Sequence, residues 1–144
     1  LPRAYGPPTN VDPIQHYLGT AFGWAGNPRE GSVYFSEAPP QNDGQTPYVL
    51  TMPADVPTDA FWSVSLYNHH GFFETNDYEA YTYNSVTAAR EPDGSVVIHF
   101  GGDPQMSNFL PIMDGWNYLI RCYRPRAEIL EGRWSPPSAH RVDG

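Results

Sequence analysis

Hydrophobic and polar residues alternate along several short runs of the chain. The clearest run is residues 61–67, in which Trp62, Val64 and Leu66 alternate with a mixed set of side chains. Alternate residues of a strand point to opposite faces, so this run predicts a β-strand with one apolar face and one mixed face. The mixed face is either half-solvated or lines a pocket. The same pattern predicts strands at residues 32–36, 47–52, 81–87, 95–100 and 116–123.

Turn signals separate these runs. Asp43-Gly44 predicts a hairpin turn between residues 32–36 and 47–52, and Pro92-Asp93-Gly94 predicts a second one between residues 81–87 and 95–100. Asp114-Gly115 is expected to turn the chain into the last strand. With 16 prolines and 13 glycines in 144 residues, the chain is typical of many short strands joined by tight turns.

Two short helical segments interrupt the strand pattern. Asp12 is a good N-cap, Pro13 suits the first helical position and Gln15 completes a capping box, so a helix is expected to begin here and to end near Gly23 or Gly26. One face of it is apolar and His16 points away from that face. A second segment, residues 125–130, predicts one or two helical turns.

These elements predict a mainly β fold: an antiparallel β-sandwich, jelly-roll-like, with a short N-terminal helix and a short C-terminal helical turn. Residues 1–11 contain three prolines and predict an extended arm or linker. Residues 12–137 then form a single domain, and residues 138–144 a tail.

The net charge of −8 narrows the choice of partners. All eight basic residues are arginines, and such an acidic surface repels phosphate groups, so we expect no nucleic-acid binding. We also expect no membrane insertion, because no apolar run approaches the ~20 residues that a span requires. The chain begins at Leu1 rather than Met, and an upstream segment is expected to be missing.

Cys122 is the only cysteine, so neither an internal disulfide nor a paired-thiol zinc site can form. A thiolate nucleophile is the weaker interpretation, because Cys122 lies in an alternating run where a small buried hydrophobe is the usual occupant.

Adjacent histidines, His69 and His70, raise the question of a metal site. A bound ion would require a bent backbone and a third ligand such as Glu74 or Asp77. We favour a turn with the histidines at its exposed tip, because Asn68 and Gly71 suit turn geometry. No metal site and no cofactor are predicted.

The candidate ligand site is a polar and aromatic set on the strands with Arg121 at its centre. An arginine flanked by tyrosines suits a carboxylate or sugar ligand. Equally, Arg121 could pair with Asp114 or Glu128 as a structural bridge. The candidate residues are His16, Tyr67, Asn68, Asn84, Asn117, Arg121 and Tyr123, with Tyr83 nearby. His16 alternatively satisfies its ring through a backbone carbonyl or solvent.

Long phrases of the sequence carry a resemblance to a known family. They are residues 12–24 (DPIQHYLGTAFGW), 61–68 (FWSVSLYN), 93–102 (DGSVVIHFGG) and 110–130 (LPIMDGWNYLIRCYRPRAEIL). In this order they resemble the bacterial and fungal family called domain of unknown function twelve-fourteen. The resemblance covers about residues 12–137 and implies a jelly-roll-like fold, carried as the C-terminal part of two-domain, often exported proteins. It implies no reaction, substrate or metal.

The expected function is therefore that of a ligand-binding or assembly module of an exported protein, located in the periplasm or secreted. One alternative is a small-molecule hydrolase or isomerase with a pocket around His16 and Arg121. Another is a purely structural subunit-interaction module. The expected partners are a small-molecule ligand and either a missing N-terminal domain or a second copy of the chain.

Overall fold

A computed structural model describes residues 31–143. The predicted arm at residues 1–11, the predicted helix beginning at Asp12, and His16 lie outside the described residues.

The described residues form a mainly β fold, as the alternating pattern predicts. The strands are β1 (Ser32–Glu37), β2 (Tyr48–Met52), β3 (Trp62–Tyr67), β4 (Thr82–Asn84), β5 (Val96–Phe100), β6 (Phe109–Leu110), β7 (Asn117–Tyr123) and β8 (His140–Arg141). One helix, α2 (Ala127–Leu130), confirms the predicted C-terminal helical turn. Within residues 31–143, no helix is long and apolar enough to cross a membrane.

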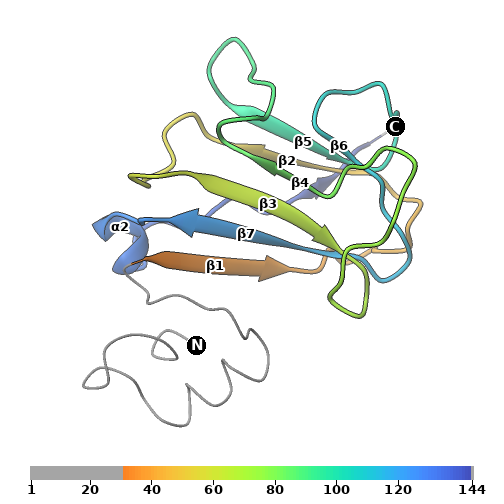
Figure 1. Cartoon of the computed structure of the whole chain (residues 1–144), viewed down its shortest axis with the longest axis horizontal. Coiled ribbons are helices and arrows are strands. Elements are labelled where there is room, and N and C mark those ends of the chain that lie inside the picture. Colours follow the sequence, from red (N-terminus) through yellow and green to blue (C-terminus); the bar gives the residue numbers. More distant parts are fainter. Residues whose placement is uncertain (1–30, 144) are drawn as a thin grey trace, which may run out of the picture.

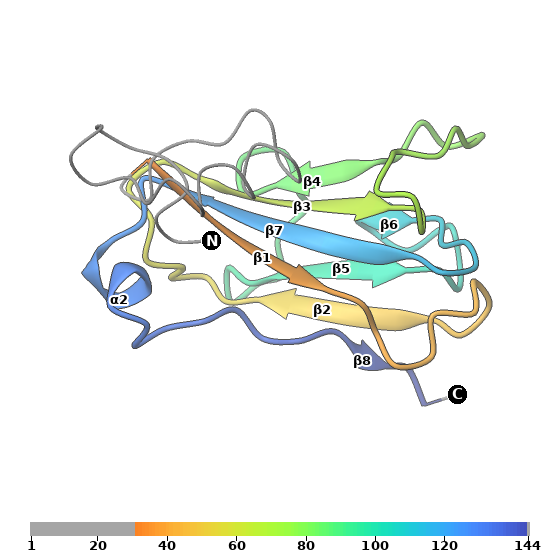
Figure 2. The same cartoon turned by 90° about the horizontal axis from the view of Figure 1, so that it is seen from below.

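The strands form two four-stranded sheets in the described part of the chain. Their orders are β1-β7-β3-β4 and β6-β5-β2-β8. Figures 1 and 2 show the two sheets as two layers, with α2 at one end. Two residues from the predicted tail form β8, which pairs with β2 through Tyr48↔Arg141 and Val49↔His140.

The predicted hairpins are wrong. Strands β1 and β2 lie in different sheets, and so do β4 and β5, so each of these connections crosses between the layers. Turn residues reverse the chain direction locally, but they do not decide which strand it then pairs with. Strand β2 instead pairs with β5, and β7 lies between β1 and β3.

One pair also departs from the predicted antiparallel arrangement. Strands β5 and β6 are parallel, with His99↔Phe109 and Phe100↔Leu110 in register. Gly101 and Gly102 both have positive φ angles and turn the chain out of β5. Asn108 then fixes its return, because its side chain bonds the backbone of Ala89 and the carbonyl of Val97.

A single core fills the space between the layers. Val64, Leu66, Ile120 and Cys122 from one sheet join Leu50, Met52, Val96, Ile98 and Phe100 from the other, and all are almost fully buried. Burying one such aliphatic or aromatic side chain contributes about 1.5–3 kcal/mol. Trp116 anchors one end of the core, where its ring stacks on Phe100 at 4.9 Å and meets the edge of Tyr48 at 5.8 Å.

Two predicted turns pack against each other at that end. Gly44 has a φ of +78°, and a Cβ placed on it would lie 2.6 Å from the Asp114 nitrogen and 2.7 Å from the Met113 carbonyl carbon. The Gly115 N–H donates to Asn42 O at 2.8 Å, which joins the two turns. Glycine at position 44 is therefore needed both for its conformation and for the close approach of another backbone segment.

Gly44→Ala is expected to destabilise the domain more than Gly71→Ala. Both glycines have φ near +80°, but nothing lies within 4 Å of a Cβ on Gly71. Gly71→Ala should cost only the left-handed penalty, about 1–2 kcal/mol. Gly44→Ala should add an overpacking cost of about 1–3 kcal/mol. Urea unfolding of both variants measures the difference, and equal losses would show that the contact between the turns does not constrain position 44.

Candidate functional site

The outward face of the β1-β7-β3-β4 sheet carries the candidate site. Cross-strand register places Tyr34 and Ser63 on either side of Arg121, and Ser65 and Tyr67 follow Ser63 on the same face of β3. This is the mixed face predicted from the alternation, and its partner face packs into the core.

Arg121 is held in place by two hydroxyl groups. Its Nη1 donates to Ser65 Oγ at 3.1 Å and its Nη2 donates to the Tyr67 hydroxyl at 2.7 Å. The guanidinium carbon lies 5.6 Å from the centre of the Tyr34 ring and 5.9 Å from that of Tyr67. A cation over an aromatic ring at this range gains about 0.5–1 kcal/mol at an exposed site. Ser65 and the two tyrosines thus fix the guanidinium with neutral groups.

The predicted alternative, a structural bridge from Arg121 to Asp114 or Glu128, is not formed. The ion pairs between side chains of residues 31–143 are Arg126 with Asp59, Arg133 with Glu131, and Arg141 with Asp143. A guanidinium has five N–H donors, and the two hydroxyl contacts leave others for a ligand.

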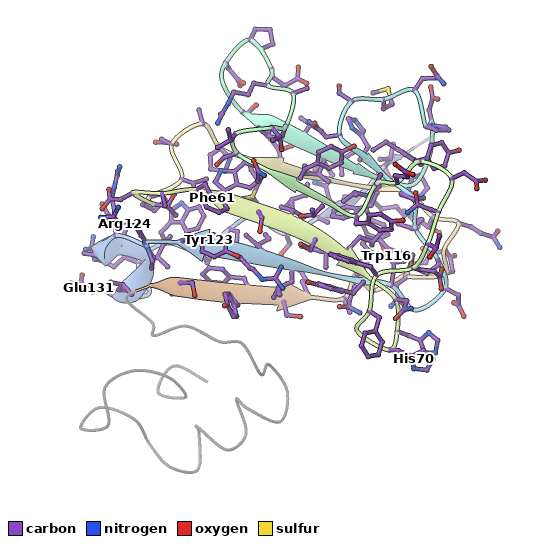
Figure 3. The ribbon with its side chains drawn as sticks, viewed as in Figure 1. Phe61, His70, Trp116, Tyr123, Arg124 and Glu131 are labelled. Atoms are coloured by element: carbon purple, nitrogen blue, oxygen red, sulfur yellow. The ribbon has the colours of Figure 1, made fainter. Side chains whose placement is uncertain are left out.

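Aromatic rings flank this arginine. Phe61 stacks on Tyr123 at 4.5 Å, and Figure 3 shows the two side by side. Phe73 stacks on Tyr67 at 5.1 Å with an interplanar angle of 2°. Several of the rings are exposed: Phe73 by 50%, Tyr34 by 41% and Phe61 by 37%. We call this set the Arg121 face; it consists of Tyr34, Phe61, Ser65, Tyr67, Phe73, Arg121 and Tyr123.

Asn68 and Asn117 hold the turn after β3 rather than the guanidinium. Asn68 Oδ1 accepts from the N–H groups of His70 and Phe72, at 3.0 and 3.1 Å. Asn117 Nδ2 donates to Asn68 O at 3.1 Å. Their amides therefore set the position of the loop that carries Phe73.

Asn84 and Tyr83 also have structural partners. Asn84 Oδ1 accepts from the N–H groups of Val86 and Thr87, at 2.8 and 2.9 Å. Tyr83 lies on the opposite face of β4, packs on the core and donates its hydroxyl to Phe109 O at 3.1 Å. Burial raises the pKa of the Tyr83 hydroxyl. Tyr83 is therefore separated from Arg121 by the sheet itself.

The histidine pair forms the predicted exposed turn. The Gly71 N–H donates to Asn68 O at 2.9 Å, the φ of Gly71 is +81°, and the two imidazole ring centres lie 3.8 Å apart. Figure 3 shows His70 at the outer tip of this loop. In the described part of the chain, no three His, Cys, Asp or Glu side chains are grouped as metal ligands.

The sequence prediction missed Tyr34, Ser65, Phe61 and Phe73. Ser65 could have been found from the period of two, because it lies two residues before Tyr67 on the same strand face. Tyr34 could not, since its place beside Arg121 follows from the pairing of β1 with β7. Phe73 reaches the face because the Asn68 turn folds its loop back onto Tyr67.

Comparisons with known proteins bear on this fold. The family described as "Protein of unknown function (DUF1214)" matches residues 32–127. The VPA0106 protein from Vibrio parahaemolyticus has a similar crystal structure, with 22% sequence identity and a TM-score of 0.77. The similarity covers 94% of this chain but 36% of that one, so this chain spans about a third of the length of that protein. At this identity the likeness concerns the fold alone. No curated protein sequence matches the chain.

Cys122 is expected to resist thiol reagents in the folded protein. Its side chain is fully buried, and burial raises the pKa of the thiol to about 12. Because the thiolate is the reactive form, dithionitrobenzoate at pH 8 should modify the folded chain only as fast as it unfolds. The same reagent in guanidinium chloride should titrate one thiol per chain. Rapid labelling without denaturant would contradict the assignment of Cys122 to the core.

Proposed function

The chain belongs to the DUF1214 family of proteins of unknown function, and from this premise we propose that the domain binds a small carboxylate-bearing molecule on its Arg121 face. The observation that carries the proposal is a guanidinium fixed by two hydroxyls and two aromatic rings, without a carboxylate partner among the described residues.

The chemistry of the Arg121 face favours an anionic group. A planar guanidinium binds a carboxylate through two parallel N–H···O bonds, and such charge-assisted bonds are about twice as strong as neutral ones. The Ser65 and Tyr67 hydroxyls reduce the rotational freedom of the arginine before a ligand arrives, which lowers the entropic cost of binding. A selective anion site on a chain of net charge −8 needs a fixed cation of this kind.

The aromatic rings add a second requirement for the ligand. Phe61, Tyr123, Tyr67 and Phe73 form two stacked pairs beside the guanidinium. A sugar or aromatic ring carried by the ligand can pack on such surfaces while its carboxylate meets Arg121. We therefore favour uronic acids and cyclic organic acids over small linear acids.

We also propose that the domain is the C-terminal module of a longer exported protein, which is periplasmic or secreted. The length of the Vibrio protein, of which the similar region covers 36%, supports the longer chain. A jelly-roll-like path is supported by the alternation of β1, β2 and β3 between the two sheets. The hydrolase or isomerase alternative requires His16 beside Arg121 and stays a prediction.

Galacturonate is expected to bind and to perturb the NMR signals of Arg121 and Tyr67, whereas galactose, which lacks the carboxylate, should bind at least tenfold more weakly. Arg121→Gln should weaken galacturonate binding roughly 10- to 100-fold, since hydrogen bonds to charged groups contribute about 1.5–3 kcal/mol. Tyr67→Phe keeps the ring and removes one anchor of the guanidinium, so it should weaken binding by a smaller factor.

Arg126→Gln is the matched control, because Arg126 is an exposed arginine already paired with Asp59 at 2.8 Å. Benzoate serves as a second probe with an aromatic ring. If neither acid shifts the Arg121 signals, or if Arg126→Gln weakens binding as much as Arg121→Gln, the Arg121 face is not the binding site.

A further inference from the structure

The loop that joins β3 to β4 adds a row of aromatic rings to one end of the Arg121 face. Phe73 stacks on Tyr67 at 5.1 Å, and the Tyr81 ring lies 5.4 Å from Phe73. The guanidinium carbon of Arg121 lies 5.9 Å from the centre of the Tyr67 ring, so Tyr67 links the cation to this row. Phe73 is 50% exposed, which leaves about half of its side chain available to a ligand.

The opposite end of the face is less open. Ser32 lies opposite Tyr123 in the β1–β7 register, is only 6% exposed, and has a fully buried hydroxyl. Figure 3 shows Phe61 and Tyr123 at this end, away from His70, which lies in the loop that carries Phe73. A ligand anchored at Arg121 therefore has more room to extend toward Phe73 than toward Ser32.

We propose that the ligand is a disaccharide with a single carboxylate, a class that rests on the carboxylate site proposed above. Its uronic acid meets Arg121 beside Tyr67, and its second sugar, which is uncharged, packs on Phe73. The C–H face of a sugar ring is apolar, and covering it with an aromatic ring removes apolar surface from water. The Tyr81 hydroxyl has no hydrogen-bond partner within residues 31–143, and it suits the hydroxyls of a sugar better than a plain hydrocarbon.

The charge of the same loop explains why the second sugar is uncharged. Glu74 follows Phe73 directly, Asp77 and Glu79 lie in the same loop, and all three are exposed. None of them belongs to the ion pairs formed within residues 31–143. A carboxylate on the second sugar would approach these negative charges without a cation to meet it, and like charges repel. A uronic acid joined to a neutral sugar therefore fits the face better than two joined uronic acids.

Three acids tested by isothermal titration calorimetry separate these possibilities: galacturonate, digalacturonate, and digalacturonate with one carboxyl group methyl-esterified. The monoester should bind about 3- to 10-fold more tightly than galacturonate, since its second ring gains an aromatic surface. Digalacturonate has the same two rings but one more charge, and it should bind more weakly than the monoester.

Phe73→Ala should abolish the gain of the monoester, so that the ratio of its affinity to that of galacturonate falls to about one. Phe72→Ala is the matched control, because Phe72 is the neighbouring phenylalanine, is 69% exposed and lies outside the Arg121 face. It should leave the ratio unchanged. Phe61→Ala alters the other stacked pair of the face and should also preserve the ratio. Glu74→Gln removes one loop charge and should bring digalacturonate closer to the monoester.

The outcomes distinguish the two proposals. If galacturonate does not bind at Arg121, the carboxylate site fails and the disaccharide site fails with it. If galacturonate binds but the monoester binds no more tightly, or if Phe73→Ala keeps the ratio, only the disaccharide site is overturned. Digalacturonate that binds as tightly as the monoester would contradict the uncharged second sugar. A larger fall of the ratio in Phe61→Ala than in Phe73→Ala would place the second sugar at the wrong end.

Discussion

The packing of two apolar sheet faces against each other is the constraint on which the rest of this structure depends. Val64 and Ile120 are fully buried between the layers, together with Leu50 and Ile98 from the opposite sheet. Because side chains alternate along a strand, each inward residue fixes its neighbours on the outer face. Ser65 and Arg121 are therefore placed outside by the same burial that places Val64 and Ile120 inside. The alternation of side chains along the strands therefore produces both the apolar core and the outer face that carries the candidate site.

The same constraint explains why neutral groups surround Arg121. A guanidinium could not be buried in the core without a paired charge, since an isolated buried ion costs far more than hydrophobic packing returns. On the outer face it keeps its charge, and hydroxyls on the neighbouring strand orient it without neutralising it. Tyr83 shows the opposite case. It lies on the inner face, and its hydroxyl is satisfied by a backbone carbonyl, so it belongs to the core.

Two turns then decide how the ends of the sheets are built. The Asn68 side chain bonds the backbone of its own loop and brings Phe73 back over Tyr67, which adds an aromatic wall to the Arg121 face. At the core end where Trp116 lies, Gly44 lets one turn approach the backbone of another closely. Elsewhere the edges are short, and β1 is the exception within the described residues. The pairing of the strands thus determines the apolar core, the Arg121 face and which strands lie at the edges of the sheets.

The sequence by itself determined what depends on neighbouring residues. The period of two predicted β1, β2, β3, β5 and β7, and β4 in part, but not the two-residue strands β6 and β8. It also predicted the division of residues 61–67 into an inner and an outer face, and Asn68 with Gly71 predicted the exposed histidine turn. Only the tertiary structure decided which strands pair. The predicted hairpins failed because β2 pairs with β5, whose buried side chains share its core. For the same reason the sequence could group Arg121 with Tyr67 but could not find Tyr34. Periodicity is a local property of the chain, whereas cross-strand register depends on how two distant segments bury their apolar faces together.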